Sequence, residues 1–258
     1  TRKALNNVSM DFNKGNIIGI IGSNGSGKST LFNNLMGILK STEGEILYNG
    51  EQIKYDKKSL YNLRKEVGIV FQDPEKQIFY SMVYDDIAFA LRNIGIDEKT
   101  IKERIHTALE AVNGLQFIDR PVHNLSFGQK KRVAIASVVA MENKLVLLDE
   151  PTAGLDPIST RAIVDIIKGL NKRGVKIVIS SHDMNLIYEI CDYVYVLNQG
   201  VLINEGTREE VFINEEKIDE AGLELPWLVK LHKNMGLPLF TREEDLYSYW
   251  NHREQKTV

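Results

Sequence analysis

The sequence predicts an α/β fold, in which strands buried on both faces alternate with amphipathic helices. The first observation is a continuous apolar run over residues 16–21, which leads into a glycine-rich segment over 22–29 and then helix-spaced apolar residues over 31–39. The second is residues 145–180, which repeat the alternation as strand, helix and strand. Uninterrupted apolar strands are typical of sheets that are covered by helices on both faces.

The remaining strands are shorter or less apolar. Alternation of Val8, Met10 and Phe12 with polar residues predicts a half-buried strand, and residues 44–48 and 67–71 predict two more. Residues 194–203 predict a hairpin that turns at Asn198-Gln199-Gly200.

The middle of the chain is helical. Residues 83–94, 98–112 and 129–141 carry apolar residues at helical spacing. After residue 222 the strand–helix alternation stops. We therefore predict a main domain over 1–222, with a helical subdomain over about 74–142, and a small helical extension over 223–258.

Composition excludes several classes of protein. The 258 residues are 43% hydrophobic and carry a formal net charge of −3, which does not favour a nucleic-acid partner. The single cysteine, Cys191, excludes an internal disulfide and is typical of a small core residue. No apolar run reaches the ~20 residues that cross a bilayer. The sequence does not begin with Met, so we expect that an N-terminal piece is missing.

The glycine-rich segment has the pattern of a phosphate-binding loop. Gly22-x-x-x-x-Gly27-Lys28-Ser29 follows a predicted strand and opens a helix. Glycines let the backbone wrap a phosphate closely, and the helix N-terminus adds positive potential. We expect Lys28 to reach the β- and γ-phosphates and Ser29 to ligate Mg²⁺. The predicted nucleotide-binding residues are Ser23, Asn24, Gly25, Ser26, Gly27, Lys28, Ser29 and Thr30.

Polar residues follow three of the predicted strands. Asp149-Glu150 follows residues 145–148, Gln72 follows residues 67–71, and His182 follows residues 175–180. Because ligands of open α/β sheets bind beyond the carboxyl ends of the strands, we expect these side chains to face the phosphate loop. Asp149 suits Mg²⁺ coordination, Glu150 suits the general base that activates water, and His182 suits a sensor of the γ-phosphate.

A second candidate segment for reading phosphate is Leu125-Ser126-Phe127-Gly128-Gln129, for which the alternative is an ordinary capped helix. Ser126 is a natural helix N-cap, and Gly128 permits close backbone approach. One nucleotide seldom needs two such devices in one chain. The pair suggests a nucleotide held between two copies of the protein.

In their order these motifs resemble the ATP-binding subunits of ABC transporters. The resemblance implies a P-loop NTPase fold with a mixed sheet core, an antiparallel β subdomain, a helical insert and a C-terminal tail. It assigns Gln72 to the Q-loop, where it contributes to the Mg²⁺ site, and Asp156 to the D-loop. It implies ATP and Mg²⁺ as cofactors and a second ATPase subunit, identical or related, whose ATP meets Leu125 to Gln129. The predicted catalytic set is Glu150, His182, Gln72 and Lys28, and the Mg²⁺ set is Ser29, Gln72 and Asp149.

A narrower resemblance points to the energy-coupling-factor class of importers, and within it to the cobalt importers. Val70 to Phe79, Val83 to Phe89, and Leu125 to Ala136 carry this similarity. It implies a transmembrane coupling protein docked near residues 73–86, a substrate-binding membrane protein, and a peripheral place on the cytoplasmic face of the membrane. The alternatives are import of nickel or a vitamin, an ABC export ATPase, and a soluble ABC ATPase that acts in DNA repair, chromosome organisation or translation.

The sequence departs from the family at one place. Members usually carry an aromatic residue that stacks on adenine in a strand ahead of the phosphate loop. Only Phe12 precedes the loop here, and its alternation with polar neighbours assigns it to a strand interior. We assign no adenine-stacking residue.

Overall fold

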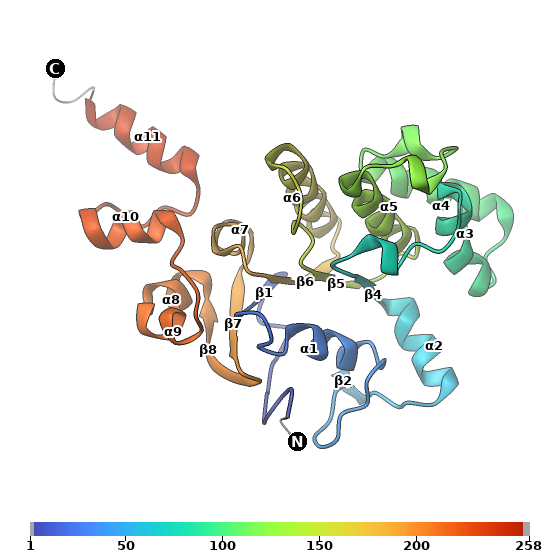
Figure 1. Cartoon of the computed structure of the whole chain (residues 1–258), viewed down its shortest axis with the longest axis horizontal. Coiled ribbons are helices and arrows are strands. Elements are labelled where there is room, and N and C mark those ends of the chain that lie inside the picture. The colour runs from blue at the N-terminus through green and yellow to red at the C-terminus, as the bar shows by residue number, and fades with distance from the viewer. Residues whose placement is uncertain (1–2, 255–258) are drawn as a thin grey trace. The chain divides into compact units, whose positions relative to one another are not determined.

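The computed structural model describes residues 3–254 (Figure 1). By the density of contacts the chain divides into two units, residues 1–28 with 181–258 and residues 29–180. Helix α1 (Lys28–Leu35) begins at Lys28, which is the last residue of the segment 1–28.

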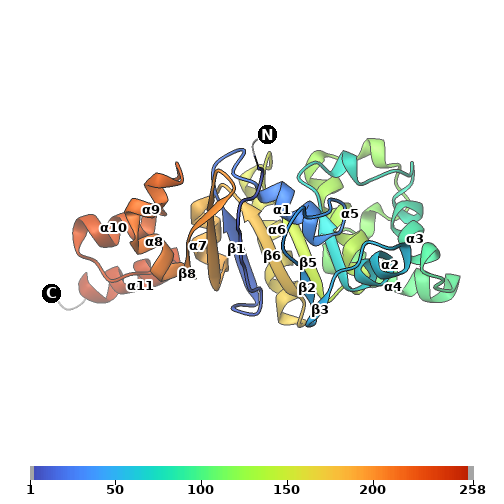
Figure 2. The same cartoon turned by 90° about the horizontal axis from the view of Figure 1, so that it is seen from below.

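In the first unit, a mixed group of three strands forms the core. Strand β1 (Ile17–Ile21) pairs in parallel with β7 (Tyr193–Asn198), and β7 pairs antiparallel with β8 (Val201–Thr207) (Figure 1; Figure 2 labels β1 and β8). Each residue of β1 is buried, as its uninterrupted apolar sequence predicts. The hairpin turns at Gln199 and Gly200, both with positive φ.

Within its described residues, the first unit also contains five helices. They are α7 (Met184–Ile190), α8 (Arg208–Ile213), α9 (Glu215–Glu220), α10 (Trp227–Met235) and α11 (Glu243–Glu254). Asp183 caps α7, and Thr207 with Glu210 forms a capping box on α8. Cys191 is fully buried, in agreement with the core position predicted for it.

The second unit contains three parallel strands. Strand β5 (Leu145–Asp149) lies between β4 (Val67–Val70) and β6 (Lys176–Ser181), and the register pairs Val70 with Leu148 and Asp149 with Ser180. A separate antiparallel pair consists of β2 (Leu47–Tyr48) and β3 (Glu51–Gln52). Together with the mixed pairing in the first unit, these sheets confirm the predicted fold class.

Longer helices surround these strands. They are α2 (Lys57–Glu66), α3 (Val83–Asn93), α4 (Glu98–Ala111), α5 (Phe127–Ala140) and α6 (Pro157–Lys172). Helices α3, α4 and α5 pack on one another as the predicted insert, which Figure 1 shows in green. The short 3₁₀ turn η1 (Pro74–Lys76) lies between β4 and α3, and η2 (Leu115–Phe117) and η3 (Val122–Asn124) lie between α4 and α5.

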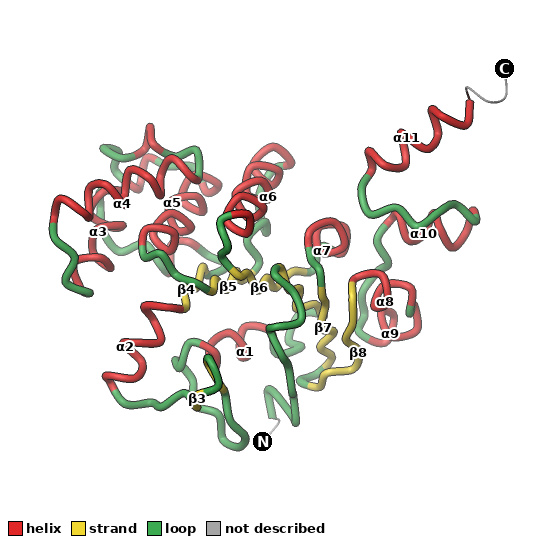
Figure 3. The backbone as a smooth tube through the Cα atoms, turned by 180° about the vertical axis from the view of Figure 1, so that it is seen from behind, coloured by secondary structure: helices red, strands yellow, loops and turns green. Residues whose placement is uncertain are grey.

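One predicted strand does not form. Residues 8–12 form a loop, drawn in green in Figure 3. Phe12 packs edge-on against Tyr195, with 6.1 Å between the centres of the two rings. The Tyr195 hydroxyl also accepts from the Asp11 N–H at 2.9 Å and donates to the Asp11 carbonyl at 2.8 Å. These contacts bury one side of an irregular segment. They produce the alternation of a strand without a strand partner.

Candidate nucleotide and magnesium site

The glycine-rich loop lies between β1 and α1. Gly25 and Gly27 have φ of 78° and 110°, a region that side chains with a Cβ rarely adopt. A Cβ on Gly27 would also approach the Ala4 carbonyl oxygen to 2.8 Å. Glycine is therefore required here for the loop to keep its path.

Lys28 is buried within this loop. Its side chain is 7% exposed, and its ammonium donates to the carbonyl oxygens of Gly22 at 2.7 Å and Ser23 at 3.2 Å. The loop therefore curls around the lysine, while Asn24 and Gly25 are exposed at its tip. The loop keeps a cation among its backbone groups, a favourable setting for a phosphate.

A hydroxyl and a carboxylate meet at the end of β5. The Ser29 hydroxyl donates to Asp149 Oδ2 at 2.9 Å, and the Ser180 hydroxyl donates to Asp149 Oδ1 at 2.5 Å. Asp149 is 7% exposed, whereas Ser29 is exposed. Hydroxyl and carboxylate oxygens are the ligands that Mg²⁺ prefers, so this pair fits the ion predicted from the sequence.

Glu150 directly follows β5 and has an unusual backbone. Its φ is 48°, in the left-handed region, and its side chain is buried. Its N–H donates to the Ser180 carbonyl at 3.1 Å, and its own carbonyl accepts from the Ala153 N–H at 3.2 Å. Such strain persists only where surrounding contacts hold it, and it is concentrated at functional sites.

The other two predicted site residues, Gln72 and His182, also come shortly after the ends of strands. Gln72 is exposed two residues after β4, whose last residue pairs with Leu148 of β5. Gln72 and the carboxylates thus lie at the same edge of the parallel strands. His182 follows the last residue of β6 and is exposed in the first unit. The catalytic roles of Gln72 and His182 stay predictions.

The second phosphate-reading segment forms the start of α5. Ser126 caps the helix: its hydroxyl accepts from the Gln129 N–H at 3.3 Å, and the Gln129 side chain accepts from the Ser126 N–H at 2.9 Å. Helix α5 begins at Phe127, two residues earlier than the apolar pattern predicts. Leu125 is buried, while Ser126 and Phe127 are exposed. This exposure leaves the segment accessible to a partner.

The start of α5 packs on the segment that follows Glu150. A Cβ added to Gly128 would lie 3.2 Å from Ser159 Oγ and 3.5 Å from Leu155 Cδ2, so only a small residue permits this approach. Asp156 caps α6 by accepting from the Ser159 N–H at 2.9 Å and from its hydroxyl at 2.7 Å. Both hydrogen bonds hold the pKa of the Asp156 carboxyl below its usual value.

Sequence reasoning missed Lys131. It is fully buried, and its ammonium donates to the Glu150 carbonyl at 2.7 Å. The signal was present, because Lys131 shares a helical face with Ala134, Ile135 and Val138, an i, i+3, i+4, i+7 pattern that is otherwise apolar.

Comparison with known proteins identifies the family. A profile described as "ABC transporter" matches residues 5–153, more than half of the chain. The chain belongs to the ABC transporter family. This ABC ATPase binds and hydrolyses ATP, as its family does, and ABC ATPases pair as dimers and work with membrane components.

Several curated relatives match over nearly the whole chain. A putative ABC transporter ATP-binding protein of Listeria monocytogenes is 52% identical over 96% of this chain and 92% of its own. The cobalt import ATP-binding protein CbiO of Salmonella typhimurium is 47% identical over 98% and 92%. The energy-coupling factor transporter ATP-binding protein EcfA of Methanocaldococcus jannaschii is 46% identical over 88% and 81%. The ABC ATPase is therefore the ATP-binding subunit of an ABC transporter of the energy-coupling-factor type.

Solved structures of ABC ATPases are also similar to this chain. The CbiO1 protein of Clostridium perfringens, described as part of the ABC transporter complex CbiONQ, has a TM-score of 0.77 at 42% identity, with 89% of this chain and 92% of that one covered. The ATP-binding cassette MJ0796, in a dimeric post-hydrolysis state with ADP and phosphate, has a TM-score of 0.71 at 28% identity, with 80% and 90% covered. Within residues 3–254 of the ABC ATPase, no helix is long and apolar enough to cross a membrane.

Proposed function

We propose that this ABC ATPase powers the uptake of a transition-metal ion, cobalt in particular, through an energy-coupling-factor importer. The similarity to CbiO over 98% of the chain is the observation that carries the proposal. The ATPase domain spans residues 1–222, with its helical subdomain over about 74–142, and residues 223–258 form a separate extension. The subunit lies on the cytoplasmic face of the membrane.

In the proposed reaction, the phosphate loop holds ATP and the strand ends act on it. Lys28 donates to the β- and γ-phosphates, and residues 23–30 supply the remaining contacts. Ser29 and Asp149 hold Mg²⁺, with Gln72 contributing; the 2.9 Å between the Ser29 and Asp149 oxygens supports this choice. When bound, Mg²⁺ neutralises the charge that develops on the phosphates.

Glu150 acts as the general base and accepts the proton of the attacking water, and His182 orients the γ-phosphate. Leu125 to Gln129 of one subunit face the ATP of the other, with Asp156 beside them. The exposed Ser126 and Phe127 support this arrangement. Hydrolysis then releases the contact between the two subunits.

The surface beside η1 and α3 suits the transmembrane coupling protein. Phe79 is 78% exposed, and Tyr80 and Phe89 are also exposed. A hollow of about 360 Å³ lies beside them; its lining includes Ile78, Val122 and Lys130. Exposed aromatic side chains around a hollow are typical of a surface that binds a partner protein. We propose that a short helix of the coupling protein docks here.

Co-purification from detergent-solubilised native membranes tests the proposal. A tagged full-length protein is expected to bring with it a coupling membrane protein and a substrate-binding one, identified by mass spectrometry. Uptake of cobalt by cells, measured against nickel and vitamins, then decides the cargo. Recovery from the soluble fraction alone would contradict the importer proposal, and a lone exporter-type membrane protein would replace it with export.

The docking surface has its own matched pair of variants. Phe79→Ser is expected to lose the membrane partners while ATP binding is retained. Tyr61→Ser removes an exposed aromatic ring of α2, distant in sequence, and is expected to retain both. Equal recovery of the membrane partners by both variants would contradict docking at Phe79.

A further inference from the structure

Lys131 is a charged side chain in an apolar setting. It lies on α5 in the otherwise apolar face defined above, and none of its surface is exposed. Burial lowers the pKa of Lys131 to about 8, while the nearby carboxylates of Glu150 and Asp149 act in the opposite direction.

A buried ammonium is costly for the fold. An apolar residue of the same volume often serves a packed position equally well or better, because it needs no desolvation of a charge. Packing alone therefore does not account for a lysine at this position. Its contacts show what the charge holds.

The main contact is with the backbone of Glu150. The ammonium donates to the Glu150 carbonyl at 2.7 Å, within the range of a charge-assisted hydrogen bond. That carbonyl belongs to the residue with φ of 48°, a strained conformation that surrounding contacts must hold. A donor on this carbonyl therefore helps to fix the backbone from which the Glu150 side chain projects.

The second contact is with the exposed segment at the start of α5. Lys131 Nζ lies 5.6 Å from the centre of the Phe127 ring, one helical turn earlier. The Cε1 atom of that ring lies 3.5 Å from where a Cβ of Gly154 would be. One buried cation thus joins the start of α5 to the backbone of the residue beside Asp149.

We propose that Lys131 is a positioning residue, which holds the Glu150 carbonyl and so ties the direction of the general base to the position of α5. The inference rests on the proposed role of Glu150. A movement of α5 carries the ammonium with it and changes the direction of the carboxylate. The segment that faces the partner's ATP is thereby linked to the base that acts on the subunit's own ATP.

The test compares Lys131→Met with a matched control on the same helix. Arg132 also donates to a main-chain carbonyl, that of Asn113 at 3.1 Å. Its guanidinium carbon lies 5.2 Å from the centre of the Phe117 ring. Steady-state ATP hydrolysis by the full chain gives kcat and KM, and thermal unfolding gives Tm. We expect Lys131→Met to lower kcat by roughly 10- to 100-fold with KM within about twofold, since small misplacements of a reacting group cost this much. We expect Arg132→Met to keep kcat within about twofold, and Tm shows whether either variant has lost stability.

Two further variants complete the design. Lys131→Arg restores a cationic donor and is expected to recover most of the lost kcat. In a Glu150→Gln background, Lys131→Met is expected to cause no further loss, because both changes act on one group. Wild-type kcat in Lys131→Met, or an equal loss in Arg132→Met, overturns the inference.

The outcomes separate this inference from the proposed role of Glu150. If Glu150→Gln hydrolyses ATP at the normal rate, Glu150 is not the general base. If Glu150→Gln is inactive but Lys131→Met is fully active, only the inference about Lys131 fails. Should Lys131→Met not fold, Lys131→Ser, which leaves room for water, is judged by the same criteria.

Discussion

Lys28 and Lys131 are both buried lysines that donate to main-chain carbonyls, but they are anchored at different distances along the chain. Lys28 donates to Gly22 and Ser23, six and five residues away, within one loop. Lys131 donates to Glu150, 19 residues away on another element. The first cation is held by a local turn, and the second depends on the packing of a helix against a strand end.

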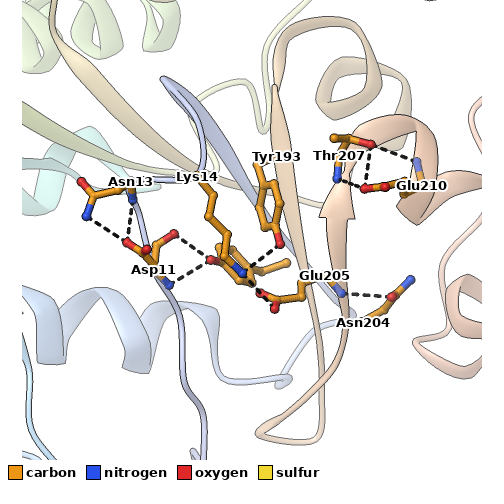
Figure 4. Close-up of polar contacts among 9 residues, drawn as sticks. Asp11, Asn13, Lys14, Tyr193, Asn204, Glu205, Thr207 and Glu210 are labelled. Carbon is orange, nitrogen blue, oxygen red and sulfur yellow. Dashed lines mark hydrogen bonds and ion pairs between the residues drawn. The ribbon is translucent and has the colours of Figure 1, made fainter.

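The difference in anchoring matches the difference in the proposed tasks. Hydrogen bonds within one loop hold the Lys28 ammonium among backbone groups, which suits a side chain that binds phosphate oxygens. A cation shared between α5 and the end of β5 reports the relative position of two elements. Figure 4 shows a third lysine, Lys14, in the first unit. It is exposed, and its ammonium donates to side chains: to the Tyr193 hydroxyl at 3.0 Å and to Glu205 Oε1 at 3.0 Å.

The largest effect is expected on ATP binding when Lys28, the lysine held within one loop, is removed. Lys28→Ala is expected to weaken equilibrium ATP binding by roughly 100-fold or more, because charge-assisted hydrogen bonds contribute about 1.5–3 kcal/mol each. Binding of a fluorescent ATP analogue measures it. Lys14→Ala, which removes a lysine of the same unit that donates to Tyr193 and Glu205, is the control and is expected to bind normally. Unchanged ATP affinity in Lys28→Ala would refute the role of the phosphate loop.

The next effect separates binding from chemistry. Glu150→Gln is expected to bind ATP and to form the dimer, while hydrolysis slows by roughly 10²- to 10⁴-fold, the usual contribution of a general base. Size-exclusion chromatography with ATP and a phosphate-release assay measure the two properties. Normal turnover in this variant would rule out Glu150 as the base.

The same distinction explains what the sequence could predict. The loop around Lys28 is contiguous in sequence, so its pattern and its flanking strand and helix sufficed to place it. Asp149 and Glu150 were placed because a buried strand ends in two carboxylates. The contact of Lys131 with Glu150 joins distant residues, and no local pattern carries such a contact.

The predicted strand over residues 8–12 failed for a related reason. Alternation reports which side chains are buried, but it does not report whether a neighbouring strand is present. Here the burial comes from Tyr195, which receives Phe12 edge-on and exchanges hydrogen bonds with Asp11. No apolar pattern predicts helix α2, because it is strongly polar and Leu63 is its one buried residue.

A smaller effect is expected at the start of the helix that carries Lys131. Ser126→Ala removes the hydroxyl that accepts from the Gln129 N–H, and loss of an N-cap costs about 1 kcal/mol. Urea unfolding measures the change. Thr207→Ala removes the equivalent capping box of α8 and is the control: both variants are expected to lose similar stability, and only Ser126→Ala is expected to slow ATP hydrolysis. Equal hydrolysis would confine Ser126 to capping.

The smallest expected effect concerns Asp86, a buried carboxyl group that is bonded to main-chain groups, as the two lysines are. Asp86 is 9% exposed, and its Oδ1 accepts from the Phe79 N–H at 2.8 Å and the Tyr80 N–H at 3.1 Å. Burial raises the pKa of Asp86 above its usual value. Just above that usual value, the folded protein still binds a proton that the unfolded chain has released. The contribution of Asp86 to the free energy of unfolding therefore falls as pH rises through this window.

Asp97 provides the opposite sign. Hydrogen bonds from the backbone and side chain of Thr100 lower the pKa of Asp97, so its contribution to stability is lost as pH falls. Urea unfolding from pH 3 to 7 should show that Asp86→Asn, whose amide oxygen can still accept from both N–H groups, removes a loss of stability with rising pH. Asp97→Asn should remove a gain. If the two variants alter the pH dependence in the same direction, burial of charge does not govern Asp86, and the cost assigned to the buried ammonium of Lys131 has to be reconsidered with it.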